Sequence, residues 1–157
     1  MTIRLRTHQK IHIQSSSDIF HLMQPILRRC SKRDRAREHF WILCLNAAQT
    51  VTHLELVGLG TQRSVQIDPK EVYHLALLKD ACSIVAVHNH PSGRLKPSYA
   101  DKVITKSLLA IGQFHNIKLL DHLIICEENY FSFMDEGLFE VLNSDASMVV
   151  SSALAAA

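Results

Sequence analysis

The segment Val87–Lys102, VHNHPSGRLKPSYADK, constrains this chain more than any other. It follows an apolar, β-branched run at 83–88, which is typical of a central strand buried on both faces. The prolines and the glycine within the segment force a loop, and Ser98 is placed to begin a helix. The chain is therefore expected to contain a buried strand, a loop and a helix in direct succession.

Two histidines end this strand on one face. His88 and His90 are separated by one residue, and alternate side chains of an extended strand share a face. With Ser98 as the N-cap, Asp101 occupies the third helical position, and its carboxylate points back toward the loop. Two imidazoles and a carboxylate are the ligands of a catalytic zinc site that keeps a fourth position for water. The spacing therefore predicts a metal site formed by His88, His90 and Asp101.

Each part of this pattern also has a simpler interpretation. Ser98 followed by Asp101 fits an ordinary helix cap, in which the helix dipole favours an acid. A His-x-His pair arises readily by chance in a chain with ten histidines. His122, next to an aspartate in an apolar run, is interpreted as a core or interface histidine. The metal-site interpretation depends on the agreement of the parts.

A metal-activated water needs a base to take its proton. Glu55 is the candidate, because it is a lone carboxylate within an apolar stretch, where an unpaired buried charge is costly. Ser98 is predicted to donate a hydrogen bond to the developing oxyanion or to orient a ligand. His53 lies two residues before Glu55, shares its face, and is a candidate for a supporting role.

The rest of the chain alternates strands with helices, which predicts an α/β fold with a mixed β-sheet flanked by helices. Residues 40–58 are typical of two strands joined by a tight turn, and 64–67 of a further short strand. An Asp-Pro pair at 68–69 predicts a helix start. Residues 118–126 and 130–133 are expected to form a closing strand pair.

The length of 157 residues, nearly half of them hydrophobic, suits one domain with a sizeable core. We divide the chain into an N-terminal arm, helix and basic connector (1–38), a catalytic domain (39–143) and a flexible tail (144–157). The helix in the arm is predicted to begin at Ser17. A hydrophobic edge near the arm would allow a homodimer.

The net charge of +2 is too small to argue for a nucleic-acid or membrane partner. Six basic residues crowd 28–38, and we interpret them as a solvated helix end and loop, with phosphate binding as the alternative. The four cysteines lack paired spacing, and three within apolar runs are predicted to be buried in a reducing compartment. No leader and no membrane-length apolar run are visible, so the expected location is the cytoplasm, without a membrane partner.

The pattern of His88, His90, Ser98 and Asp101 with an upstream glutamate resembles the JAMM motif of the JAB/MPN metalloprotease superfamily. The strings HNHPSG, DHLII and SFMDEGL resemble its RadC-like branch, over about Phe40 to Leu138. The resemblance implies a cytidine-deaminase-like JAB/MPN fold that binds Zn²⁺ through the two histidines and the aspartate.

The resemblance also implies roles for two further residues: Glu55 as general acid/base and Ser98 as stabiliser of the transition state. The implied reaction is cleavage of peptide or isopeptide bonds in a protein or peptide substrate, including conjugates of ubiquitin-like modifiers. The alternative is a DNA repair-associated nucleic-acid-binding protein or nuclease that uses the basic stretch. A deaminase is disfavoured, because the chain has neither H-x-E nor P-C-x-x-C.

Overall fold

The computed structural model describes residues 2–4 and 11–144. Parts of two predicted segments lie outside the described residues: 1 and 5–10 of the N-terminal arm, and 145–157 of the tail.

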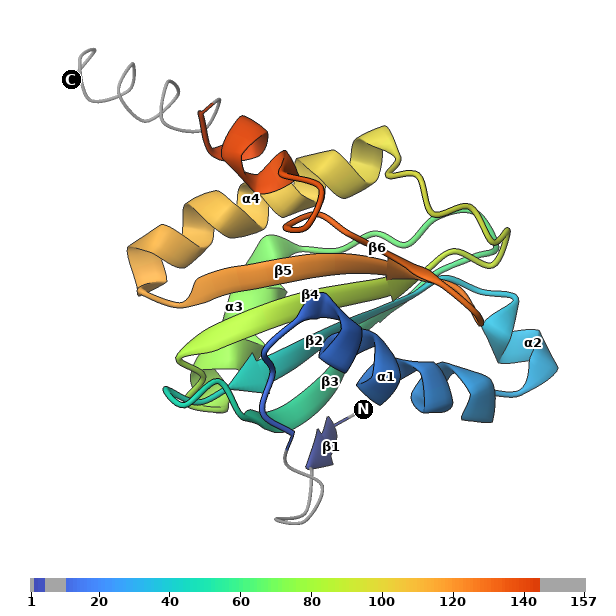
Figure 1. Ribbon diagram of the computed structural model, residues 1–157, viewed down its shortest axis with the longest axis horizontal. Helices are drawn as coiled ribbons and strands as arrows, with labels where there is room; N and C mark the ends of the chain where they lie inside the picture. Colours follow the sequence, from blue (N-terminus) through green and yellow to red (C-terminus); the bar gives the residue numbers. More distant parts are fainter. Residues whose placement is uncertain (1, 5–10, 145–157) are drawn as a thin grey trace.

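A six-stranded mixed sheet forms the centre of the fold, with strand order β1-β3-β2-β4-β5-β6 (Figure 1). Strands β4 and β5 are parallel, and every other neighbouring pair is antiparallel. The strands are β1 (Thr2–Arg4), β2 (His39–Leu45), β3 (Val51–Leu59), β4 (Ser83–Asn89), β5 (Lys118–Ile125) and β6 (Tyr130–Ser132). This sheet and its flanking helices confirm the predicted α/β fold.

Helices cover both faces of the sheet (Figure 1). Helix α1 (Ser16–Arg29) packs on one face and is followed by the short helix α2 (Lys32–Arg35). Helices α3 (Pro69–Leu78) and α4 (Tyr99–His115) pack on the other face. Residues 138–144 are helical again at the end of the described chain.

Helix α1 begins two residues earlier than predicted, because Ser15 rather than Ser17 is its N-cap. The Ser15 side chain accepts from the Asp18 N–H, and the Asp18 carboxylate accepts from the Ser15 N–H, so both groups of a capping box are present. The apolar side of α1 is buried against the sheet through Phe20 and Met23 among others. This helix, predicted as part of an N-terminal arm, thus packs directly on the sheet.

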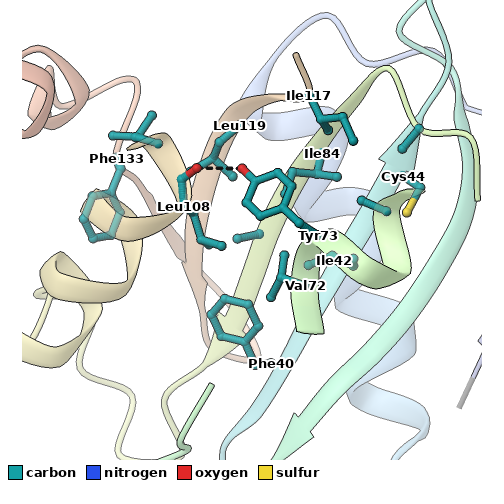
Figure 2. Close-up of a cluster of buried hydrophobic side chains, with 14 of the residues drawn as sticks. Phe40, Ile42, Cys44, Val72, Tyr73, Ile84, Leu108, Ile117, Leu119 and Phe133 are labelled. Atoms are coloured by element: carbon teal, nitrogen blue, oxygen red, sulfur yellow. Dashed lines mark hydrogen bonds between the residues drawn. The ribbon is translucent and has the colours of Figure 1, made fainter. Parts of the chain in front are cut away.

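The α3 and α4 face holds the second core cluster (Figure 2). The Tyr73 hydroxyl donates a 2.6 Å hydrogen bond to the carbonyl of Leu108, which ties α3 to α4 across buried surface. The members that Figure 2 labels are Phe40, Ile42, Cys44, Val72, Tyr73, Ile84, Leu108, Ile117, Leu119 and Phe133. Packing of this kind fixes the position of α4 relative to the end of β4.

The connection from β3 to α3 differs from the prediction. Residues 64–67 are not a strand; they run without strand pairing to Asp68, the N-cap of α3. Gly60 permits the tight turn before them, since a Cβ there would lie 2.1 Å from the Ser64 carbonyl oxygen.

All four cysteines are free thiols, but they are not equally buried. Cys44 is buried as predicted, whereas Cys82 is exposed and Cys126 half-buried, because each lies at a strand end rather than inside a strand. Among the described residues no helix combines the length and apolar character needed to cross a membrane.

Candidate metal centre

The two histidines lie at the carboxyl end of β4, the strand paired on both sides at the middle of the sheet. His88 is within the strand and buried, and His90 follows it directly. The His90 N–H donates to the carbonyl of Ile125 at 3.1 Å, so pairing with the neighbouring chain continues past the strand end. The extended conformation needed to turn both imidazoles to one face is therefore present.

Asp101 reaches the same place from the first turn of α4. Ser98 is the N-cap, and its N–H donates to Asp101 Oδ2 at 2.6 Å, while the Asp101 N–H donates to Ser98 Oγ at 3.2 Å. This capping box turns the carboxylate back toward the loop, as predicted. Asp101 Oδ1 lies 3.2 Å from His88 Nε2, and Oδ2 lies 3.4 Å from His90 Nε2.

The three side chains converge on one point. The Nε2 atoms of His88 and His90 are 2.9 Å apart, and one ligand atom from each of the three residues lies within 4.8 Å of the others. A tetrahedral zinc ion with bonds of about 2.0–2.1 Å has neighbouring ligand atoms about 3.3 Å apart. The observed separations scatter around that value, so these residues fit a single ion with one position open.

The charge of the cluster suits a cation. Burial alone would raise the pKa of Asp101, but hydrogen bonds with His88 and His90 outweigh burial and hold that pKa well below its usual range. Burial likewise lowers the pKa of His90, yet hydrogen bonds to Asp101 and to the Arg94 carbonyl raise it above the usual value. Asp101 is therefore an ionised carboxylate, the state a metal ligand requires.

A second carboxylate at the cluster is Glu38, the last residue of the predicted basic connector. It directly precedes β2, is half-buried, and lines the same cleft as His88 and His90. Burial raises the pKa of Glu38 against the charges of the two histidines and a hydrogen bond with the backbone of Val65. Strand pairing is what brings Glu38 to the cluster. β2 runs antiparallel to β4, with Phe40 opposite His88, so the residue before β2 lies near the residues after β4.

The structure does not bring Glu55 to the cluster. Glu55 lies on β3 opposite Ile42, so β2 separates it from β4, a distance of two strand spacings or about 10 Å. Its buried carboxylate lies 3.4 Å from the Nζ of Lys79 at the end of α3. The cation that accompanies this buried acid is therefore a lysine. His53, on the same strand, has its ring 3.1 Å from Thr52 Oγ1, again away from the cleft.

A cleft of about 1490 Å³ leads to the cluster. Its walls are two loops, residues 62–68 and 94–98, together with the first turns of α4. The cluster lies at the cleft's floor, with His88 buried and His90 half-buried. Ser98 also lines the cleft, beside Asp101.

Two other predictions can be compared with the structure. His122 is buried as expected for a core histidine, and its Nε2 lies 2.9 Å from His88 Nδ1. Burial holds the pKa of His122 well below its usual range, so this ring is neutral. In the basic stretch, Arg28 and Arg35 pair with Glu128 and Glu127 at 3.0 and 3.2 Å. Part of that positive charge is therefore matched within the molecule.

Comparison with known proteins gives one family. Residues 13–138 match the model of the RadC-like JAB domain. A UPF0758 protein of Flavobacterium johnsoniae is 42% identical over 127 residues, covering 81% of this chain and 53% of that relative. A UPF0758 protein of Chlorobium chlorochromatii is 38% identical over 126 residues, covering 80% and 54%. A UPF0758 protein of Staphylococcus haemolyticus is 36% identical over 136 residues, covering 87% and 58%. The chain spans a little over half the length of these relatives.

Proposed function

This chain belongs to the RadC-like JAB domain family, and we propose from that premise and from its metal centre that it is a zinc-dependent hydrolase of peptide or isopeptide bonds. The observation that carries the proposal is the convergence of His88, His90 and Asp101 at the floor of a cleft. Such a ligand set leaves one coordination position free for chemistry. When bound, zinc would polarise a carbonyl and lower the pKa of water toward 7.

We assign the proton transfer to Glu38 rather than Glu55. A carboxylate whose pKa is raised by burial can hold a proton between its removal from water and its delivery to a leaving amine. Glu38 lines the cleft, as a group that meets both water and substrate must. Ser98 keeps the role predicted from the sequence: its hydroxyl donates to the oxyanion, since its oxygen already accepts from the Asp101 N–H.

The shape of the cleft supports a polypeptide substrate. Both long walls are loops without strand pairing, so a polypeptide lying between them would meet backbone polar groups along its length. The cleft is lined by residues of both charges. The cations include Arg63, Arg94 and Lys96, and the acids include Glu38, Asp68 and Glu71. This mixture does not favour a phosphate backbone. We include conjugates of ubiquitin-like modifiers, which the resemblance implies, among the proposed substrates.

The test compares two glutamates of different position. Glu38→Gln should retain zinc and lower turnover about 10²–10⁴-fold, the usual contribution of a proton-transfer group. Glu55→Gln is the matched control: it should leave turnover within a few-fold and reduce the free energy of unfolding by about 1–3 kcal/mol, because Lys79 loses its buried partner. Turnover is measured with quenched-fluorescent peptide libraries and an isopeptide-linked diubiquitin, and zinc by elemental analysis of protein purified without chelator.

Two results would contradict the proposal. Absence of stoichiometric zinc or another divalent metal in the wild-type protein would remove the metal centre. Full activity of Glu38→Gln, together with an inactive Glu55→Gln, would mean that Glu55 rather than Glu38 transfers the proton. His88→Ala completes the series, because loss of this ligand should abolish both metal content and turnover.

A further inference from the structure

A buried chain of hydrogen bonds runs from one ligand of the metal centre to the backbone of another. His88 Nδ1 lies 2.9 Å from His122 Nε2, and His122 Nδ1 lies 2.7 Å from Thr105 Oγ1. Thr105 Oγ1 donates to the backbone carbonyl of Asp101 at 2.5 Å. The chain therefore joins β4, β5 and α4, and His88, His122 and Thr105 are each no more than 1% exposed.

The last link fixes the direction of all the others. A backbone carbonyl can only accept, so the Thr105 hydroxyl hydrogen points at Asp101. The Thr105 oxygen must then accept from His122, which places the His122 proton on Nδ1. The bare Nε2 of His122 in turn accepts from Nδ1–H of His88. His88 is thus left with its lone pair on Nε2, the nitrogen that faces Asp101 and His90.

The opposite direction is disfavoured by the same geometry. If the Thr105 hydroxyl donated to His122, its oxygen would face the Asp101 carbonyl at 2.5 Å with lone pairs on both atoms. His90 reaches the matching state by a shorter route, because its Nδ1 lies 2.6 Å from the Arg94 carbonyl oxygen. With Nδ1 of each ring committed to a hydrogen bond, both imidazoles direct Nε2 toward one point, where a metal ion can take the place of a shared proton.

We propose that Thr105 and His122 are positioning residues that lock His88 in the tautomer and orientation able to bind a metal ion. The inference rests on the proposed metal centre and adds residues outside its ligand set. Partners of ligating histidines typically change metal affinity 10–100-fold when removed. Here the partner of His88 is the His122 imidazole, which is itself hydrogen-bonded to Thr105. Removal of the Thr105 hydroxyl should therefore lower metal affinity as well, although Thr105 lies on α4 and the two histidines lie on β4 and β5.

Thr105→Val tests the inference, because valine keeps the volume and removes the hydroxyl. The matched control is Tyr73→Phe, which also removes a buried hydroxyl that donates to a carbonyl of α4, that of Leu108 at 2.6 Å (Figure 2). Tyr73 does not line the cleft. Co²⁺ affinity is measured by competition with a chelator, the cobalt absorption spectrum reports the ligand field, and urea unfolding of the metal-free proteins reports stability. Thr105→Val should weaken Co²⁺ binding at least 10-fold and alter the spectrum, whereas Tyr73→Phe should change affinity less than about 2-fold at a similar loss of stability.

His122→Phe is the second variant, since a phenyl ring can keep the stacking on Phe133, whose ring centroid is 4.8 Å from that of His122. It should weaken Co²⁺ binding at least as much as Thr105→Val. A direct measurement needs no variant: nitrogen chemical shifts of the zinc-loaded, ¹⁵N-labelled protein should place the His122 proton on Nδ1.

The outcomes separate the inference from the proposed function. Wild-type affinity and spectrum in Thr105→Val, or equal weakening by Tyr73→Phe, would overturn the positioning role while the metal centre stands. A His122 proton found on Nε2 would overturn it as well. A wild-type protein that binds neither Co²⁺ nor Zn²⁺ would end both. Metal binding that depends on Thr105, in a protein without peptidase activity, would support the inference and contradict the proposed reaction.

Discussion

Two helices of this protein begin with the same capping box, and only one of these two boxes lies at the candidate metal centre. Ser15 and Asp18 begin α1, and Ser98 and Asp101 begin α4, with the same two reciprocal hydrogen bonds in each pair. The Asp18 carboxylate accepts from the N–H groups of Gln14 and Ser15 at 2.9 Å each. The Asp101 carboxylate instead faces the rings of two histidines.

The difference lies in what the rest of the fold places in front of the box. The hydrogen bond from the Gln14 N–H, together with those from Ser15, lowers the pKa of Asp18, which is exposed to solvent. Asp101 is largely buried, and the histidines must overcome that burial to keep its pKa low. The capping box therefore sets only the direction of a carboxylate. The carboxylate is placed to bind a metal ion where a buried strand ends opposite it.

The largest expected effect comes from removing the charge of each box in turn. Asparagine can keep the hydrogen bond from the cap N–H while losing the anion. Asp101→Asn should weaken zinc binding more than about 100-fold, since changes to groups that merely touch a ligand already cost 10–100-fold. Asp18→Asn should leave zinc affinity unchanged. Affinity is measured by competition with a chromophoric chelator.

Circular dichroism of both variants provides the control, because each should keep its helix. Zinc affinity of Asp101→Asn equal to that of the wild type would mean that the α4 box is only a cap. That result would make the two boxes equivalent and remove the carboxylate from the metal centre.

The sequence predicted the parts of the site that are local and missed the part that depends on pairing. His88, His90, Ser98 and Asp101 lie within one strand–loop–helix unit, and spacing alone gave their directions. The proposed base is different, because Glu38 directly precedes β2 in the basic stretch, whereas Glu55 lies within the apolar β3. Choosing between them requires knowing that β2, not β3, lies beside β4.

The fold followed the same rule. Turn and cap chemistry predicted the β2–β3 hairpin and the start of α3 at Asp68, because those signals are local. Residues 64–67 have strand-like composition but find no partner strand among the described residues, so tertiary context overrode propensity. The contact between His122 and His88 could not be predicted for a similar reason. It joins the neighbouring parallel strands β4 and β5, and no short sequence motif reveals the register of that pair.

A smaller effect should appear in the stability of metal-free protein against pH. The pKa of Asp101 is lowered from 3.8, so its contribution is present above about pH 4 and is lost as pH falls through the lower folded value. The pKa of His90 is raised from 6.5, so its contribution is present below pH 6.5 and is lost as pH rises through the higher folded value. The interactions among His88, His90 and Asp101 should therefore stabilise the metal-free protein most between about pH 4 and 6.5.

Asp101→Asn isolates this contribution. The difference in free energy of unfolding between wild type and variant should be about 1.5–3 kcal/mol within that window, the usual range for a charged hydrogen bond, and should shrink on both sides. Urea titrations in the presence of a chelator measure it at each pH. A difference that stays constant from pH 4 to 8 would contradict the coupling of Asp101 to His90.

The smallest effect distinguishes the two serines. Ser98→Ala and Ser15→Ala each remove an N-cap side chain, and each should reduce the free energy of unfolding by about 1 kcal/mol. Zinc affinity should fall only a few-fold in Ser98→Ala, because the Ser98 backbone N–H still holds Asp101 Oδ2 at 2.6 Å. Ser15→Ala should leave it unchanged. Urea unfolding and chelator competition give both numbers, and a loss of zinc affinity in Ser98→Ala as large as in Asp101→Asn would mean that the hydroxyl, rather than the backbone, orients the carboxylate.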